Sequence, residues 1–307
     1  MSQPSSRPSG RPKNGRRAGG GVSYRLAEAV VRVVAASPRP VRAATAWVLG
    51  GLTYLCLGSR RRVAEANIAA AFPDMRPGAV RSLARHSIRN MIFNATELLY
   101  CQALTPEQVR ARVTVEGLER LEEALAEGRG LIALTGHVGP FTLIAAALAL
   151  LGHPSSYVYR YMNAGAPNLV LERVCREWGV GLISALPRRR AAFACLAALR
   201  RGEIICILGD QHANDGIPVP FFGREALTAP GAAVLAERTG APILPMFIRA
   251  TGRSSYVVDV GWRVSPDPTA ARDERIRSIV AGATRAVEEA VRRDPAQWFW
   301  LHRRWRV

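Results

Sequence analysis

The stretch GLIALTGHVGP, residues 130–140, decides the fold. Its first six residues form a continuous apolar run, which is typical of a strand buried on both faces of a sheet. A turn containing two glycines and a proline follows at once, and an apolar helix then extends to about Leu151. A buried strand that passes directly into a helix indicates a parallel α/β arrangement.

The segments on both sides of this stretch repeat the alternation of strand and helix. From residue 113 onward, the pattern predicts an α/β fold with a central mixed, largely parallel sheet flanked by helices. The strands are expected near 113–115, 130–135, 155–160, 181–184, 203–209, 242–248 and 255–262, and the helices over 117–128, 167–178, 190–200, 230–239 and 270–292.

The part of the chain before this domain divides into two regions. Residues 1–22 are rich in Gly, Pro, Ser and Arg and have almost nothing to bury, so they are expected to form a disordered basic tail. Residues 23–112 are expected to be helical, which leaves 113–307 as the α/β domain. The uncharged run 43–59, with arginines on both sides, indicates a membrane anchor, although a helical hairpin packed on the domain is the alternative.

The charge balance restricts the kind of partner. The net charge is +18, and Lys13 is the only lysine, so arginine carries nearly all of the positive charge. Such an excess suggests an anionic partner, which could be nucleic acid, anionic lipid or an acidic carrier protein. Arginine usage typical of a GC-rich genome is the alternative. The five cysteines show no metal-type spacing and are expected to be small core residues.

His137 is the first candidate for chemistry because it directly follows the buried strand. Sites in α/β sheets gather at the carboxyl ends of the strands. The positive end of the following helix can stabilise negative charge that develops beside a general base. A hydrogen-bonded structural histidine is the alternative.

Asp210 follows the apolar strand near 203–209 and is expected at the same sheet edge as His137. A carboxylate there could orient an imidazole and stabilise its charged form. The alternative is that Asp210 only shapes the polar turn DQHANDG, in which His212 is a weaker candidate base.

Two further groups of residues could bind a substrate. Arg160 ends a predicted strand, and Asn163 follows it; an arginine at such a position can hold a phosphate. The C-terminal sequence QWFWLHRRWRV combines tryptophans with Arg303 and Arg304. It could dock as a buried segment, bind an anionic headgroup or stack on nucleic acid.

Several segments together resemble the bacterial lipid A biosynthesis lauroyl/myristoyl acyltransferase family, which includes the phosphatidylinositol mannoside acyltransferases. The resemblance runs from about residue 44 to the end. It is carried by the order and spacing of RRRVAEANIAAAFPD (60–74), GLERLEEALAEGRGLIALTGHVG (117–139), YVYRYMN (157–163), DQHANDGIPVPFFGREALTAPGAAVLAERTGAPILPMF (210–247) and QWFWLHRRW (297–305).

The resemblance implies an acyltransferase that needs no metal or organic cofactor. A fatty acyl chain would move from an acyl carrier protein or coenzyme A thioester to a hydroxyl of a membrane lipid or glycolipid. His137 would be the general base, and Arg160 would lie at the polar substrate site. The segment that contains Gln211, Phe221, Phe222 and Gly223 would line the far side of that site. The implied location is the cytoplasmic face of the inner membrane.

One position departs from the family pattern. The family has Asp or Glu five residues after its histidine, and this chain has Thr142. We expect Asp210 to supply the missing carboxylate; Glu97, in the family-like segment NATELLY, is a lesser candidate. Ala296 also departs from the family, which commonly has Glu there. The alternative functions are a catalytically inactive lipid-binding member and, on charge alone, a nucleic-acid-binding protein.

Overall fold

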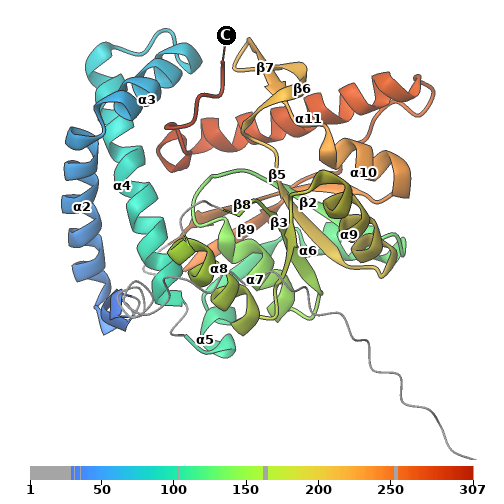
Figure 1. The fold of residues 1–307 in the computed structure, drawn as a ribbon, viewed down its shortest axis with the longest axis horizontal. Coiled ribbons are helices and arrows are strands. Elements are labelled where there is room, and N and C mark those ends of the chain that lie inside the picture. The colour runs from blue at the N-terminus through green and yellow to red at the C-terminus, as the bar shows by residue number, and fades with distance from the viewer. Residues whose placement is uncertain are drawn as a thin grey trace, which may run out of the picture.

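A seven-stranded sheet forms the centre of the protein. The computed structural model describes residues 29–30, 32–34, 36–101, 104–161, 165–251 and 255–306, without the side chains of residues 165–167, 169–170 and 174. The strand order is β1-β9-β8-β2-β5-β3-β4 (Figure 1). The strands are β1 (Val113–Glu116), β2 (Leu131–Thr135), β3 (Ser155–Tyr159), β4 (Gly181–Ser184), β5 (Ile204–Leu208), β8 (Ile243–Ala250) and β9 (Tyr256–Val260).

The directions of these strands confirm the predicted mixed, largely parallel sheet. β2 lies at the centre and pairs in parallel with β8 on one side and with β5 on the other. On one side, β5, β3 and β4 are all parallel to β2. On the other side, β9 is antiparallel to β8, and β1 pairs in parallel with β9. The stretch that predicted the fold therefore supplies the central strand, and all five of its residues are buried.

Helices pack on both faces of the sheet. Leu131 and Ala133 of β2 face a core shared with α5 (Pro106–Arg110), α6 (Leu118–Ala126), α7 (Thr142–Leu150) and α8 (Gly165–Glu177). Ile132 and Leu134 face the opposite core, formed with α9 (Arg188–Arg200), α10 (Gly231–Thr239) and α11 (Arg272–Arg293). Alternate residues of one strand thus fill two cores, which explains why the strand is apolar throughout.

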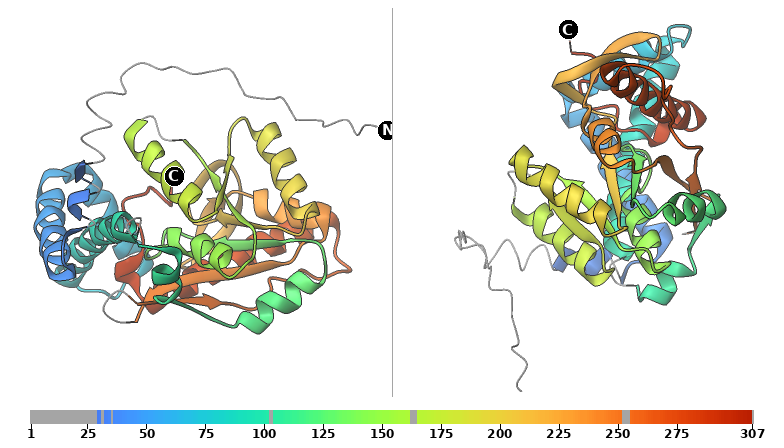
Figure 2. Two further views of the ribbon diagram at one scale, coloured as in Figure 1. Left: turned by 90° about the horizontal axis from the view of Figure 1, so that it is seen from below. Right: turned by 90° about the vertical axis from the view of Figure 1, so that its right-hand side faces the viewer.

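Three further helices lie at one end of the molecule (Figure 2). They are α2 (Arg39–Cys56), α3 (Gly58–Ala71) and α4 (Pro77–Cys101), and both α2 and α3 pack on α4. In the described residues, no single helix is long and apolar enough to cross a membrane. The pair α2 and α3 meets the length and composition criteria together, but the two helices meet at a bend of 96°.

A buried polar cluster attaches α2 to the rest of the protein. The Arg42 guanidinium lies 2.9 Å from Glu97 Oε1, and these two side chains are only 3% and 1% exposed. Tyr256 in β9 donates its hydroxyl proton to the other oxygen of Glu97, and Arg42 also stacks on the Tyr100 ring. This contact crosses the predicted domain boundary at residue 112, and the boundary itself stays a prediction. The predicted tail 1–22 lies outside the described residues.

The β6–β7 hairpin differs from the prediction. The polar sequence from residue 210 onward was expected as a loop, but it forms the two-stranded antiparallel hairpin β6 (His212–Phe221) and β7 (Arg224–Thr228). Polar residues in its first half and two prolines concealed the strand pattern. Helix α3 lies within the region 23–112 that was expected to be helical, although its run of arginines and alanines gives little apolar periodicity.

Candidate active site

His137 and Asp210 meet at the carboxyl edge of the sheet. The parallel neighbours β2 and β5 end in register, with Thr135 opposite Leu208, and each candidate residue comes two positions after its strand. Asp210 Oδ1 lies 2.9 Å from His137 Nδ1, and Asp210 Oδ2 accepts the backbone N–H of His137 at 2.9 Å. The carboxylate thus holds both the ring and the main chain of the histidine.

A third donor fixes the carboxylate. The indole N–H of Trp298 donates to Asp210 Oδ2 at 2.9 Å. Asp210 is only 3% exposed, so all of these hydrogen bonds form away from bulk water. The side chain therefore has a single well-defined orientation, with Oδ1 directed at the imidazole.

The electrostatics of the two residues are complementary. Burial alone would raise the pKa of the Asp210 carboxyl, but the His137 charge and the hydrogen bonds from His137 and Trp298 outweigh it and lower the pKa to about 2. Burial alone would lower the pKa of His137, but the charge and hydrogen bond of Asp210 raise the pKa above its ordinary value. Near neutral pH, the carboxylate is therefore ionised and stabilises a protonated imidazole.

The imidazole of His137 is partly open to solvent, and its other ring nitrogen, Nε2, is not bonded to Asp210. The side chain is 26% exposed and lies between the rings of Phe141 and Phe299. The Gln211 amide nitrogen is 3.4 Å from Nε2 and 3.5 Å from Nδ1, so it lies across the ring rather than in line with one lone pair. With Nδ1 paired to Asp210, Nε2 is the nitrogen that can take a proton from a substrate.

Gly136 lets the two loops approach each other closely. A Cβ atom at this position would lie 3.2 Å from both Cβ and Cγ of Asp210. This spacing is tighter than ordinary van der Waals contact, so any larger residue would push the carboxylate away from its three donors.

Thr142 does not take part in the pair. It is the first residue of α7, one position after Phe141. Among the described residues, its side chain makes no hydrogen bond to His137. The carboxylate that contacts the histidine comes from Asp210 instead, a residue that is distant in sequence but adjacent in the sheet.

Several of the residues predicted to bind a substrate are exposed or lie beside His137. Arg160 directly follows β3 and is exposed at the same edge of the sheet as His137. Gln211 contacts the imidazole, and Gly223 and Arg303 are exposed. Asn163 lies outside the described residues.

Three of the predicted binding residues lie inside the protein. Phe221 and Phe222 are 0% and 6% exposed and pack on the C-terminal tryptophans. Arg304 has no exposed surface, donates to the backbone oxygen of Leu227 at 2.8 Å, and also bonds Thr228. Burial lowers the pKa of Arg304 to about 10. These side chains hold the β6–β7 hairpin, and their contact with a substrate stays a prediction.

The two lesser candidates are occupied elsewhere. Glu97 contacts Arg42 and Tyr256 rather than His137. His212 Nε2 lies 3.1 Å from Asn214 Oδ1, and its backbone N–H donates to His302 Nε2 at 2.9 Å. Neither residue duplicates the contact between His137 and Asp210.

Trp298 and Phe299 are site residues that the sequence did not identify. The sequence QWFWLHRRWRV stood out as an aromatic and basic cluster, and buried docking was one of its interpretations. Trp298 and Trp300 are indeed 2% and 0% exposed. The hydrogen bond from Trp298 to Asp210 joins residues that are 88 positions apart, so no local sequence pattern could predict it.

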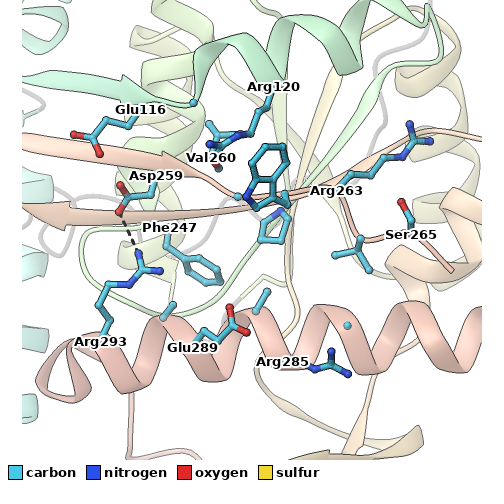
Figure 3. A pocket seen from close by; sticks show the side chains of 18 of the residues that line it. Glu116, Arg120, Phe247, Asp259, Val260, Arg263, Ser265, Arg285, Glu289 and Arg293 are labelled. Carbon is cyan, nitrogen blue, oxygen red and sulfur yellow. Dashed lines mark hydrogen bonds and ion pairs between the residues drawn. The ribbon is translucent and has the colours of Figure 1, made fainter.

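A separate cleft of about 700 Å³ lies between α11 and the β8–β9 side of the sheet (Figure 3). Its lining combines acids and arginines with the exposed ring of Trp262, on which Arg120 stacks. None of the residues that contact His137 lines it. In the part of the chain that the structure describes, no group of three or more His, Cys, Asp or Glu side chains is placed to hold a metal ion.

Comparison with known proteins identifies relatives of this chain. The chain is 25% identical over 274 residues to the lipid A biosynthesis palmitoleoyltransferase of Escherichia coli (strain K12), an alignment that covers 88% of this chain and 86% of that protein. It is 23% identical over 284 residues to the lipid A biosynthesis lauroyltransferase of the same organism, covering 91% and 89% of the two chains.

A mycobacterial relative extends the comparison. The phosphatidylinositol mannoside acyltransferase of Mycobacterium tuberculosis (strain ATCC 25618 / H37Rv) is 25% identical over 211 residues, which cover 62% of this chain and 59% of that protein. The sequence profile of the bacterial lipid A biosynthesis acyltransferases matches residues 22–307. The protein therefore belongs to the bacterial lipid A biosynthesis acyltransferase family and is an acyltransferase.

Proposed function

We propose that the protein transfers a fatty acyl chain from an acyl thioester to a hydroxyl group of lipid A or a related glycolipid, with His137 as the general base. The observation that carries this proposal is the contact between His137 Nδ1 and Asp210 Oδ1 at 2.9 Å. It leaves Nε2 of a partly exposed imidazole available to take a proton. The names of the relatives supply the class of acceptor.

In the proposed reaction, Nε2 of His137 takes the proton from the acceptor hydroxyl as its oxygen attacks the thioester carbonyl. The tetrahedral intermediate then collapses: the carbon–sulfur bond breaks, an ester forms, and the thiolate receives the proton from the imidazolium. Asp210 stabilises the imidazolium between these two transfers. The amino end of α7, which follows Phe141, offers backbone N–H groups and a positive dipole end to the oxyanion.

The rival function is that of an inactive member that binds lipid. It follows from the neutral Thr142, which cannot stabilise an imidazolium. The position of Asp210 favours an active enzyme, because a carboxylate with a depressed pKa is hydrogen-bonded to the histidine. His137 therefore keeps an ionised partner, although Asp210 follows β5 and not the strand that precedes His137.

The proposed site of action is the cytoplasmic face of the inner membrane, where α2 would lie in the interface. The outer side of this helix exposes large apolar side chains, including Trp47, Val48, Leu52 and Leu55, with exposed fractions of 50–68%. Because only half to two thirds of each side chain is exposed, burying it in lipid would contribute about 1–2 kcal/mol. Acyl carrier protein or coenzyme A would deliver the donor from the cytoplasmic side, and the net charge of +18 would attract either anionic carrier.

The proposal is tested in a strain that lacks the gene. Its lipid extract should contain a glycolipid with one acyl chain fewer than in the parent strain. The wild-type protein should restore the missing chain, whereas a His137→Ala variant expressed at the same level should not. Full restoration by His137→Ala would contradict the proposed base, and a deletion strain that loses no acyl chain would favour the inactive lipid-binding function.

A further inference from the structure

The C-terminal segment crosses the carboxyl edge of the sheet directly over the proposed catalytic pair. This segment, residues 295–306, is called the C-terminal strap below. Val138 forms an antiparallel β-bridge with Trp298, and the N–H of Phe299 donates to the backbone oxygen of His137 at 3.2 Å. The N–H of Gly139 donates to Gln297 O at 3.1 Å. The loop that carries His137 is thus hydrogen-bonded to the strap over three residues.

Trp298 extends this contact to the carboxylate. Its indole N–H and the backbone N–H of His137 both donate to Asp210 Oδ2, each at 2.9 Å. With Oδ2 occupied on two sides, the carboxylate cannot rotate about its Cβ–Cγ bond without losing a hydrogen bond. Oδ1 is left free to meet His137 Nδ1.

The strap is held from its other side by asparagines of the N-terminal helices. Asn67 of α3 donates to the backbone oxygens of Trp300 and His302 at 2.8 and 2.7 Å. Asn90 and Asn94 of α4 bond Ala296 O and the Gln297 side chain at 3.0 and 3.2 Å. The strap therefore lies between two structural layers, and its position is fixed with respect to both (Figure 1).

We propose that Trp298 is a positioning residue of this acyltransferase: its indole N–H sets the orientation of the Asp210 carboxylate, and through it the aim of the His137 base. This inference rests on the proposed function of the His137–Asp210 pair. Trp298 is 2% exposed, so its side chain is not available to touch a substrate. Its effect must therefore pass through Asp210.

This role has a specific kinetic consequence. Removing the N–H leaves the Asp210 charge in place but frees its carboxylate to turn, so the imidazole loses its fixed direction. Misplacement of a catalytic group on the scale of 1 Å can cost about 100-fold, so a partial loss of orientation is expected to cost roughly 10- to 100-fold. The loss should appear in kcat, while the KM values of donor and acceptor stay close to those of the wild type.

Trp298→Phe is the direct test, and Trp300→Phe is its matched control. Trp300 belongs to the same strap and is 0% exposed, but its indole N–H donates to Pro295 O rather than to Asp210. Both substitutions remove one buried indole. Thiol release from lauroyl-coenzyme A and lauroyl-acyl carrier protein is measured with acceptor membranes from the deletion strain. The Nδ1–H proton signal of His137 is followed by NMR in the protein without substrate.

The expected result is a fall in kcat of about 10- to 100-fold for Trp298→Phe, with a weakened or broadened Nδ1–H signal of His137. Trp300→Phe should retain both the rate and the signal. Equal rates and equal signals in the two variants would overturn the inference and reduce Trp298 to a packing residue. If Asp210→Asn is inactive while Trp298→Phe behaves as wild type, the catalytic pair stands and only the positioning role fails.

A second variant separates packing from hydrogen bonding even where Trp298→Phe folds poorly. Replacing Trp298 by β-(3-benzothienyl)alanine keeps the fused ring shape and exchanges the N–H for sulfur. The same loss of kcat and of the Nδ1–H signal is expected as for Trp298→Phe. Wild-type values for both in this isosteric variant would overturn the inference.

Discussion

At the scale of single residues, the proposed function depends on the Asp210 carboxylate, which meets the proposed base His137 from a neighbouring strand of the sheet. The family pattern places an acid one helical turn after the histidine, and this chain has Thr142 there. Asp210 meets His137 because β2 and β5 are parallel neighbours in register. Since both residues follow buried strands, their meeting at one edge could be predicted from the sequence. The contribution of Trp298 could not, because it depends on where a distant segment docks.

Introducing Glu at position 142 tests whether the acid of the family pattern would still assist His137. Nδ1 of His137 is already paired with Asp210, so a second carboxylate has no free ring nitrogen on that side. We expect Thr142→Glu to leave kcat no higher than in the wild type when acyl transfer is assayed. Thr142→Gln is the control for side-chain size. A large gain in Thr142→Glu alone would mean that Asp210 does not serve as the partner.

Gly136→Ala tests how closely the two loops must approach. The added methyl group would lie 3.2 Å from Asp210 Cβ and Cγ and would displace the carboxylate by a few tenths of an ångström. We expect kcat to fall by about 10-fold or more, because orientation of the base is lost. Gly231→Ala in α10 is the matched control, since nothing lies within 4 Å of its added methyl group. A similar kcat in both variants would refute the need for close approach.

At the scale of elements, α2 is attached by a buried charge in addition to the buried Ala46, Gly50 and Tyr54 on its inner side. The helix turns Arg42 inward, to Glu97 of α4, while several of its leucines and valines face outward. The sequence correctly indicated a helix with an uncharged, apolar run. It could not show which side faced the protein, because the buried arginine comes just before that run and was interpreted as a flanking charge.

Arg42→Met tests the strength of this attachment. The substitution leaves the Glu97 carboxylate buried without its cationic partner, and such losses typically destabilise by about 3–5 kcal/mol. The free energy of unfolding is measured by urea denaturation. The control is Arg62→Met in α3, where the arginine is exposed and an effect within about 0.5 kcal/mol is expected. Equal free energies of unfolding for the two variants would show that the buried pair contributes nothing.

At the scale of the whole molecule, the apolar outer side of α2 and the positive charge are the features on which the proposed membrane location rests. The α/β class, its mixed sheet and most strand positions were predictable, because buried strands and amphipathic helices have distinct periods. The β6–β7 hairpin was not predictable, because its polar and proline-rich first strand is stabilised by contacts with the C-terminal strap and α11.

Binding to anionic liposomes tests this environment. Leu52 and Leu55 are 51% and 68% exposed, and each should contribute about 1 kcal/mol or more in lipid. The double variant Leu52→Glu/Leu55→Glu should therefore bind at least about 30-fold more weakly in a sedimentation assay. Leu186→Glu, at a leucine that is 48% exposed between β4 and α9, is the control and should bind as the wild type. Unchanged binding of the double variant would remove α2 from the membrane contact.

The pH dependence of kcat/KM in the wild type and in Asp210→Asn tests the central claim most directly. A base must be neutral, so the rate should rise with pH through the pKa of His137, which Asp210 raises above 6.5. In Asp210→Asn the attraction is lost and burial dominates, so the inflection should move below 6.5 while the plateau falls by about 100-fold or more. An identical inflection and an undiminished plateau in Asp210→Asn would contradict the account.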